Sequence, residues 1–530
     1  MASAVAAVTI PGGVAHAEAP VSGTVVGQLV QAWPESHEAD HEADHEAEAP
    51  ISWLQTAEGD AVRIPTEDVE GIPTGTTLQV TVAPDAEDDT EDPLHDVESA
   101  QIVARAPVPP VLRNPAGLTN QVTVVRVNPD GVGRDSVSAQ QLVDAVDGPV
   151  ADFWYEQSNG AIQVGVTTAV PDWVTPVAGC ADPTALWTEV AGTVGFVPGP
   201  GRHLMLYVSS AATACNYALA EVGSSPTSGG RLYVRDTVTS VIVHELGHNF
   251  GLGHSSGRQC DAAVESASCR TAAYRDLYDV MGVSWSQLGS LNAPQASRLG
   301  VLPGSEQQTL TTAGNATRVT LAPFSTRAAV RALRLTDAEG VDYWLEYRTA
   351  TGRDAWLGTA ANRYRLETGV LLRRAEGFPD TSVLLDGTPV AAAAWDGDFA
   401  SALPVGASLP VSGGDFTVVV ESLSAAGAVL TVTPTPPNGP SVAARPAGTA
   451  TGTVMPAAGP AAAPQAADAA GLVGAPQEGA PLLRAASALE SAATSSGHGN
   501  GLLAAGAATV LAATTLLLVQ RLRGRTLRAR

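Results

Sequence analysis

The sequence predicts an α+β protein with several domains, and three observations lead to this prediction. The chain has 530 residues, which is too long for one ordinary domain. Short β-rich runs separated by turns fill an N-terminal and a C-terminal region, whereas the region between them alternates strand-like and helix-like patterns. An uncharged stretch long enough to cross a bilayer lies close to the C-terminus.

The charge is unevenly distributed along the chain. The formal net charge is −25, and residues 18–110, with 21 acidic and 2 basic residues, carry −19 of it. Nucleic-acid phosphates need basic side chains for neutralisation, so an acidic chain of this kind does not favour them. We therefore expect no nucleic-acid partner and treat the N-terminal region as a separate electrostatic unit.

Both ends of the chain carry targeting patterns. Residues 1–17 are small and apolar and end in Ala15-His16-Ala17, a pattern typical of a signal-peptide cleavage site, although the basic start is missing, as in a truncated signal. Residues 501–519 predict a transmembrane helix, and five arginines in residues 520–530 predict a basic cytoplasmic tail. We expect a single-pass cell-surface protein whose body is extracellular and whose C-terminus is cytoplasmic.

The region before residue 118 is expected to contain a spacer, a small domain and a linker. Residues 18–50 predict an acidic low-complexity spacer, because residues 37–48 read HEAD-HEAD-HEAE. This repeat matches H-E-x-x-H twice, but no apolar helical face lies beside it, so we expect a solvated segment rather than a catalytic site. Residues 51–106 predict a small β domain that could serve as a propeptide, and residues 107–117 predict a Pro-containing linker.

The small N-terminal domain has no cysteine, which excludes latency through a propeptide thiolate bound to a metal.

Residues 118–303 predict a mixed α/β domain. Its expected elements are strands over 122–127, 161–166, 204–208 and 232–234 and helices over 138–155 and 237–249.

The C-terminal half returns to β patterning. Residues 304–435 contain several short strand-like runs with turns between them, which predicts an antiparallel β-sandwich-like domain. Residues 436–500 are rich in Ala, Pro, Gly, Ser and Thr and predict a flexible stalk, because such a composition buries too little apolar surface to fold.

The segment HELGHNFGLGH at residues 244–254 carries the chemistry. On a helix, His244 and His248 share one face and can reach one metal ion. Glu245 is placed to take a proton from a metal-bound water. Gly251 lets the chain leave the helix sharply, so that His254 can return as the third ligand. Three histidines and an open position predict a catalytic zinc site rather than a structural one.

This segment resembles the metzincin metalloprotease motif, which has a second part, a Met-turn beneath the metal. Tyr278-Asp279-Val280-Met281-Gly282 is similar to that turn, with Met281 as an apolar floor under the imidazoles. The pattern is most similar to the gametolysin-like family, in which a later Asn-Ala-Pro segment recurs, here residues 292–294, and residues 343–348 are also similar. The resemblance covers roughly residues 120–435.

The resemblance implies a metzincin-type catalytic domain, a mixed sheet with an active-site helix, and a zinc endopeptidase. One zinc ion is the implied cofactor, and calcium binding stays open. The implied substrates are proteins or peptides, including extracellular-matrix or cell-wall proteins. Val283 departs from the family pattern, because some branches place there a Tyr that acts as an extra ligand or oxyanion partner, and Leu299-Gly300-Val301 departs where Gly-Trp often occurs.

No second oxyanion donor follows from the sequence. Tyr274 and Tyr278 qualify by residue type, but we expect both to pack around the Met-turn. The four cysteines, Cys180, Cys215, Cys260 and Cys269, allow three connectivities. We favour Cys260–Cys269, which closes a short loop after the third ligand, together with Cys180–Cys215, since an exported chain favours disulfides.

Two other functions compete with the protease. The first is a catalytically idle cell-surface binding or adhesion protein on a metzincin scaffold, which the intact Glu245 disfavours. In the second, the β regions bind cell-wall or matrix material and position the protease. Exposed aromatic residues would favour this, and the candidates are Trp344, Trp356 and Trp395, although tryptophans are more often core residues.

Overall fold

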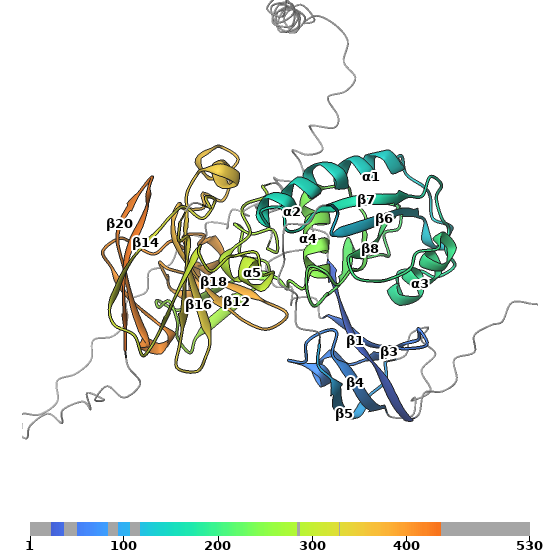
Figure 1. Cartoon of the computed structure of the whole chain (residues 1–530), viewed down its shortest axis with the longest axis horizontal. Coiled ribbons are helices and arrows are strands. Elements are labelled where there is room, and N and C mark those ends of the chain that lie inside the picture. The colour runs from blue at the N-terminus through green and yellow to red at the C-terminus, as the bar shows by residue number, and fades with distance from the viewer. Residues whose placement is uncertain are drawn as a thin grey trace, which may run out of the picture. The chain divides into compact units, whose positions relative to one another are not determined.

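The computed structural model describes residues 23–35, 50–82, 94–106, 117–282, 287–327 and 329–435 (Figure 1). These residues form many strands and few helices, which confirms the expected α+β class. The predicted signal peptide, HEAD repeat, stalk, transmembrane helix and basic tail lie outside the described residues. Within the described ranges, no helix is long and apolar enough to cross a membrane.

An N-terminal module, defined as the described residues up to 106, is built around strand β1 (Gly23–Glu35). β1 pairs antiparallel with β2 (Ile51–Thr56) and with β4 (Thr77–Val82). β3 (Ala61–Ile64) extends the sheet beside β2, and β5 (Val97–Ala104) extends it beside β4. The sheet encloses a small core that includes Leu29, Leu54, Ile64, Leu78 and Val80.

The expected spacer over residues 18–50 is wrong for residues 23–35, which form the long strand β1. The physical reason is that the acidic repeat begins only at His37. Between Ala19 and Pro34 the sequence carries no charged residue and contains several β-branched residues, which favour a strand. The small β domain therefore begins before residue 51.

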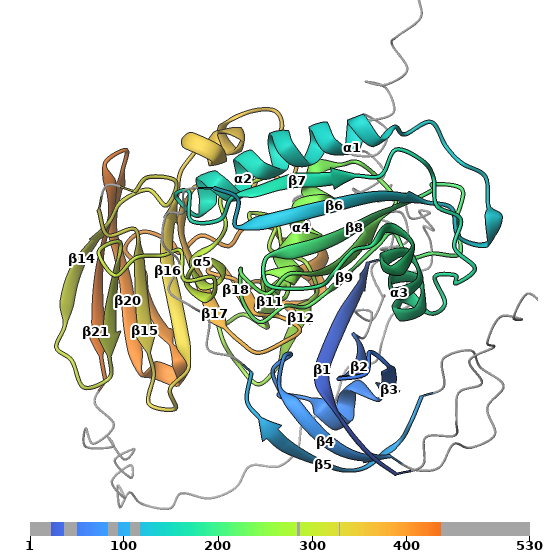
Figure 2. The same ribbon diagram turned by 45° about the vertical axis from the view of Figure 1, so that its right-hand side comes forward.

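The central domain contains a sheet whose parallel strands are β6 (Asn120–Val127), β7 (Val164–Ala169), β8 (Arg202–Val208) and β10 (Gly230–Val234). β9 (Ala218–Glu221) is antiparallel to β10. The strand order is β1-β9-β10-β8-β6-β7, so β1 of the N-terminal module continues the central sheet beyond β9 (Figure 2).

Alternating side chains of the central strands face two different helical layers. On one face, Val122, Val124 and Met205 pack with α1 (Ala139–Ala145), α2 (Ala151–Gln157) and α4 (Thr239–Asn249). On the other face, Val125, Leu204 and Leu206 pack against α3 (Pro183–Val194). This two-layer covering is typical of parallel strands, whose buried faces are both apolar.

The predicted helix over residues 138–155 is interrupted. Ser138 caps α1 by accepting a hydrogen bond from the backbone N–H of Gln141. A π-helical turn, Val146–Val150, separates α1 from α2, and Gly148 and Pro149 lie inside it. Proline lacks an N–H and disfavours the helical conformation of the residue before it, which accounts for the break. The predicted helix over 237–249 agrees with α4.

The C-terminal region contains two sheets that share one core. The larger sheet has the order β12-β11-β18-β17-β16-β15-β13, and the smaller one the order β14-β21-β20-β19. The strands are β11 (Ser255–Cys260), β12 (Cys269–Ala272), β13 (Gln307–Thr311), β14 (Thr317–Leu321), β15 (Ala332–Thr336), β16 (Asp342–Arg348), β17 (Gly369–Ala375), β18 (Ser382–Leu385), β19 (Ser408–Val411), β20 (Phe416–Ser424) and β21 (Gly427–Pro434). The short helix α5 (Ala293–Arg298) lies between β12 and β13 in the sequence.

Two details of this region differ from the expected antiparallel sandwich. The pairs β13–β15 and β11–β18 are parallel. In addition, β11 and β12 belong by sequence to the central domain but join the C-terminal sheet. The chain therefore crosses between the two sheets directly after His254, which the sequence periodicity of these short segments does not reveal.

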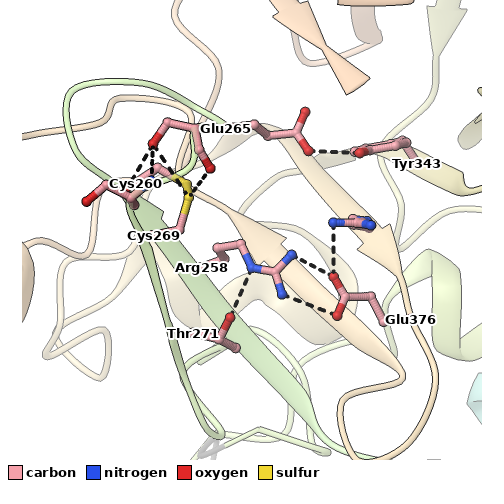
Figure 3. The surroundings of a disulfide bond; sticks show 10 residues. Arg258, Cys260, Glu265, Cys269, Thr271, Tyr343 and Glu376 are labelled. Carbon is pink, nitrogen blue, oxygen red and sulfur yellow. Dashed lines mark hydrogen bonds and ion pairs between the residues drawn. A yellow bond between two sulfur atoms is a disulfide. The ribbon is translucent and has the colours of Figure 1, made fainter. Parts of the chain in front are cut away.

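Both favoured disulfides are confirmed, Cys180–Cys215 and Cys260–Cys269. The second one joins β11 to β12, and Figure 3 shows its surroundings. On the same hairpin, Arg258 forms an ion pair with Glu376 and donates a hydrogen bond to Thr271. The disulfide and the Arg258–Thr271 hydrogen bond thus hold β11 to β12, and the ion pair with Glu376 holds this hairpin to the segment after β17.

Candidate metal centre

Helix α4 presents the first two histidines of the predicted motif on one face. His244 and His248 lie one turn apart, and their ring centroids are 4.7 Å from each other. Both side chains are buried, with 8% and 0% of their surface exposed. Asn249 fastens the end of the helix to the central sheet, because its Nδ2 donates to the Glu221 carbonyl at 2.8 Å.

The chain leaves α4 at Gly251, as the sequence predicted. Gly251 has a φ of 94°, and a Cβ at this position would lie 3.0 Å from the carbonyl oxygen of Gly223. Both features favour glycine. The turn returns His254 toward the helix, and its ring centroid lies 5.0 Å from that of His248.

The C-terminal region holds the third histidine in place. The backbone N–H of His254 donates to the Pro379 carbonyl at 2.8 Å, and its own carbonyl accepts from the N–H of Ser382 at 3.2 Å. Gln295 of α5 adds a further support, because its Nε2 donates to the Gly253 carbonyl at 3.0 Å. The position of His254 therefore depends on residues more than a hundred positions later in the chain.

The predicted Met-turn lies against α4. Met281 is fully buried, and its Sδ occupies the space that a Cβ on Gly247 would need. The turn is fixed from both sides, because the N–H of Met281 donates to Asp279 Oδ1 at 2.8 Å and its carbonyl accepts from the N–H of Ser255 at 2.8 Å. Met281 thus packs beneath the helix turn that carries His244 and His248.

The Nε2 atoms of the three histidines converge on one carboxylate oxygen that sequence analysis did not identify. Oε1 of Glu35, the last residue of β1, lies 3.3 Å from His244 Nε2, 3.5 Å from His248 Nε2 and 3.1 Å from His254 Nε2. These four side chains are buried, and together they could hold a metal ion.

Backbone carbonyls orient two of the imidazoles. His244 Nδ1 lies 2.8 Å from the Val280 carbonyl, and His248 Nδ1 lies 2.9 Å from the Leu252 carbonyl. Since a carbonyl only accepts, each Nδ1 carries the proton and each Nε2 keeps a lone pair. This is the tautomer that a metal-binding histidine needs.

The donor set fits a zinc ion. Among the described residues, the buried Nε2 atoms of His244 and His248 have no hydrogen-bond partner, although buried polar atoms normally have one. Ligands bound at about 2.0–2.1 Å to a tetrahedral zinc lie about 3.3–3.4 Å apart. The distances from Glu35 Oε1 to the three Nε2 atoms are close to this spacing.

The charges at the centre are strongly coupled. Burial raises the pKa of Glu35, but the charge of His244 and the close contacts with the three histidines outweigh it, so the pKa lies well below its usual value. Burial lowers the pKa of His254 to about 3 and also lowers that of His248, whereas for His244 the charge of Glu35 and its hydrogen bond outweigh burial and raise the pKa. Neutral imidazoles are the form that binds a metal ion.

Glu245 lies beside this group. Its side chain is 1% exposed, and Oε2 has no hydrogen-bond partner among the described residues. Burial and the charge of Glu35 raise the pKa of Glu245 well above its usual value. The carboxyl group borders a pocket with about 290 Å³ of empty space, which is also lined by Glu35, Ser240, Val241, His244, Tyr274, Val280 and Gly282.

The two candidate tyrosines have different positions. Tyr278 packs as expected, because its hydroxyl donates to the Glu367 carbonyl at 2.9 Å. Tyr274 instead lies at the centre, with its ring centroid 4.1 Å from that of His254. Burial, and then the charge and hydrogen bonding of Glu35, raise the pKa of Tyr274 well above its usual value. The expectation that Tyr274 only packs around the Met-turn is therefore incomplete, because its ring also contacts His254.

Trp33 is a second residue that the sequence analysis missed. Its ring meets His254 edge-on, with the centroids 4.6 Å apart. The signal that could have found both residues is Trp33-Pro34-Glu35, where an aromatic and a single acid end an uncharged stretch. The tryptophans suggested for wall binding do not form an exposed cluster, since Trp344 is 2% exposed and Trp356 and Trp395 are half-buried.

A buried polar network supports the Met-turn from below. Asp279 accepts hydrogen bonds from Ser255 Oγ at 3.0 Å and from the N–H of Asn292 at 2.6 Å. Asn292 caps α5 by accepting from the N–H of Gln295 at 2.9 Å. The Asn-Ala-Pro segment therefore connects the Met-turn to the helix that supports His254.

The network continues into buried ion pairs. Arg373 pairs with Asp276 at 2.7 Å and also with Glu346, and Arg348 pairs with Glu346 at 2.7 Å and with Asp354 at 3.2 Å. The backbone N–H of Ala293 donates to Glu346 Oε2 at 2.7 Å. The residues 343–348 noted in the sequence thus contribute charges that hold α5 and the Met-turn, not the metal ligands themselves.

Comparisons with known proteins add little. No family model matches the chain, and no curated protein matches it. Among solved structures, the chain is similar to one described as a chaperone-substrate complex, with 13% sequence identity and a TM-score of 0.21. The match covers 47% of this chain and 40% of that one, so the chain spans less than half of that structure's length. A likeness of this size carries no argument about fold or function.

Proposed function

We propose that the chain is a zinc endopeptidase of the metzincin type, similar to the gametolysin-like family. One observation carries the proposal. The Nε2 atoms of His244, His248 and His254 all lie within 3.5 Å of one point, and Glu245 lies directly beside them. Three imidazoles and an adjacent carboxyl group are the donors and the general base that metal-assisted hydrolysis requires.

The three histidines would hold the ion, and the carbonyls of Val280 and Leu252 orient the first two of them. A bound zinc ion acts as a Lewis acid, which lowers the pKa of water and polarises a carbonyl group. Glu245 takes the proton from the attacking water and delivers it to the leaving amine nitrogen. Burial and the charge of Glu35 raise the pKa of Glu245, which favours the uptake of a proton by this carboxyl group.

Tyr274 is the proposed second donor to the developing oxyanion. Its hydroxyl interacts with the Glu35 carboxylate, which occupies the place beside the three Nε2 atoms. A hydroxyl that donates to a carboxylate oxygen there can also donate to a negatively charged oxygen of the reacting group. This assignment supplies the role that Val283 leaves unfilled in the family pattern.

The substrates are proposed to be proteins or peptides outside the cell. The two disulfides are typical of an oxidising compartment. The pocket beside Glu245 is lined by Val241, Val280 and Gly282 together with polar and charged residues of the centre. Residues 501–519 are proposed to anchor the protein in a membrane, which alkaline carbonate extraction of membranes would test.

The direct test is peptide cleavage by the purified full chain in detergent, loaded with one zinc ion. A mixed peptide library is incubated with this protein before and after proteolysis between the N-terminal module and β6. Cutting that a chelator and Glu245→Ala both abolish would support the protease. Zinc bound at one ion per chain, without cutting under either condition, would instead favour the idle cell-surface binding protein.

A further inference from the structure

β1 leaves the N-terminal module and enters the central domain (Figure 2). Residues 23–28 pair with β4, and residues 27–32 pair with β2. Residues 32–35 pair instead with β9, with Trp33 opposite Ala220 and Glu35 opposite Ala218. Without β1, β9 would be an edge strand of the central sheet, because its other neighbour is β10.

The last five residues of β1 are held at this edge by backbone hydrogen bonds. The Gln31 carbonyl accepts from the N–H of Val222 at 2.7 Å, and the Glu35 carbonyl accepts from the N–H of Tyr217 at 2.8 Å. Trp33 is 2% exposed and packs edge-on against the ring of His254. The backbone of β1 thus fixes where the Glu35 side chain enters the centre.

Glu35 Oε1 occupies the position that a catalytic centre must keep open. It lies 3.1–3.5 Å from each of the three Nε2 atoms, the spacing of ligands that share one tetrahedral ion. A side-chain oxygen therefore lies where the attacking water would be held. The backbone carbonyl of Glu35 accepts from the N–H of Tyr217, so the Glu35 side chain and not this carbonyl contacts the histidines.

We propose that Glu35 is a fourth, removable metal ligand by which the N-terminal module keeps the protease latent. Three histidines and one carboxylate form a closed site, whereas catalysis needs three protein ligands and an open position. β1 also occupies the β9 edge, where an extended substrate could otherwise add as a strand. One segment thereby blocks both the metal and the adjacent sheet edge.

Latency ends when β1 leaves β9. The chain between Ala106 and Gly117 is the only covalent link from the N-terminal module to the central domain, so hydrolysis of one peptide bond there makes the module a separate chain. Before the cut, the carboxylate is tethered and acts at a high effective concentration. After it, dilution favours dissociation, which exposes the fourth position and the β9 edge together.

This inference rests on the proposed function, so its test must separate the two. The full chain is loaded with Co²⁺ in place of zinc, and acetohydroxamate, a small bidentate metal ligand, is added as a probe of the open position. The visible absorption of Co²⁺ reports its ligands without any reference to activity. A second form carries an engineered protease site between residues 107 and 116, which is cut only after folding, so that no separate folding of the parts is assumed.

Acetohydroxamate should leave the spectrum of the intact chain unchanged and should alter that of the cut chain and of Glu35→Ala. The matched control is Glu67→Gln, which changes an exposed carboxylate of the same module and should behave as wild type. The zinc-loaded cut chain should cleave peptides at least about tenfold faster than the intact chain, because a tethered competitor has been removed. Glu35→Ala opens the metal but keeps β1 on the β9 edge, so it should cleave peptides more slowly than the cut chain.

If the intact chain bound acetohydroxamate as readily as Glu35→Ala, Glu35 would not be a ligand and the inference would be overturned. If the spectra behaved as expected but the cut chain cleaved no peptide, the ligand role of Glu35 would stand and the protease function would fail. If Glu35→Ala failed to bind Co²⁺, the cut wild-type chain would provide the test instead. If acetohydroxamate left the Co²⁺ spectrum of the cut chain unchanged, the inference would be overturned.

Discussion

At the scale of single residues, Glu245 combines a buried carboxyl group with a position beside the pocket at the proposed metal site. One oxygen, Oε2, has no hydrogen-bond partner among the described residues, so it is available to accept a proton. Glu245→Gln should lower kcat by about 10²–10⁴-fold, the range typical of a general base. The bound zinc, measured by elemental analysis, should stay at one ion per chain. Loss of the metal would instead make Glu245 a ligand.

Tyr274 and Tyr278 offer a matched pair near the same centre. In the chain cut after folding, Tyr274→Phe should lower kcat by about 10²-fold with little change in KM, because one oxyanion donor is lost. Tyr278→Phe removes a hydroxyl of similar burial whose partner is the Glu367 carbonyl, and it should leave kcat unchanged. Equal losses of kcat in both variants would indicate a general packing effect and would contradict the role given to Tyr274.

At the scale of secondary-structure elements, α4 is fastened to the central sheet by a buried histidine. His203 Nδ1 lies 2.9 Å from Asn249 Oδ1, and its Nε2 lies 2.9 Å from Asn120 Oδ1. Burial lowers the pKa of His203 to about 4, although the hydrogen bond with Asn249 opposes the shift. The folded protein therefore keeps this imidazole neutral at a pH where the unfolded chain takes up a proton.

The sign of the resulting pH dependence follows from linkage. Above about pH 6.5 both states hold a neutral His203, and as the pH falls toward about 4 only the unfolded state gains the proton, which costs about 3 kcal/mol of stability. His203→Gln should reduce the loss of stability between about pH 7 and about pH 5 relative to wild type. Urea unfolding of both proteins at about pH 7 and about pH 5 measures this loss of stability. If the loss were equal in wild type and His203→Gln, the explanation would be refuted.

Periodicity located the long elements of the central domain but not the short ones. α4 and β6 carry clear apolar patterns and agree with the predicted segments. The strand β9 has only four residues, Ala218–Glu221, and offers too short a pattern to recognise, although it positions β1. β11 reads Ser-Ser-Gly-Arg-Gln-Cys and has no strand-like alternation of apolar residues. Its pairing with β18 is decided by tertiary contacts.

At the scale of the whole molecule, the local part of the site could be predicted and the distant part could not. His244, His248 and His254 lie within eleven consecutive positions, so helix geometry and one glycine suffice to bring them together. Glu35 reaches the same point from 209 positions before His244, through strand pairing that no local pattern encodes. Likewise, Pro379 in the connection between β17 and β18 and Ser382 on β18 hold His254 in place.

The central and C-terminal regions meet in the buried ion pairs behind the Met-turn, and this junction makes the metal centre depend on the whole chain. Arg373 on β17 is fully buried and pairs with both Asp276 and Glu346. Removing one partner of such a group leaves uncompensated buried charge, which costs much more than the net contribution of the intact pair. Asp276, one of the two carboxylates that pair with Arg373, lies shortly before Met281 in the chain.

Arg373→Met should therefore lower the free energy of unfolding by about 3–5 kcal/mol. It should also weaken zinc binding, since the Met-turn and the segment that follows His254 lose their support. The control is Arg318→Met, which breaks an exposed pair with Glu421 on the smaller sheet and should change neither property. Urea unfolding and competition for zinc with a chromogenic chelator measure the two effects. If Arg373→Met lowered stability but left zinc affinity at the wild-type value, the network would support the fold without positioning the metal ligands.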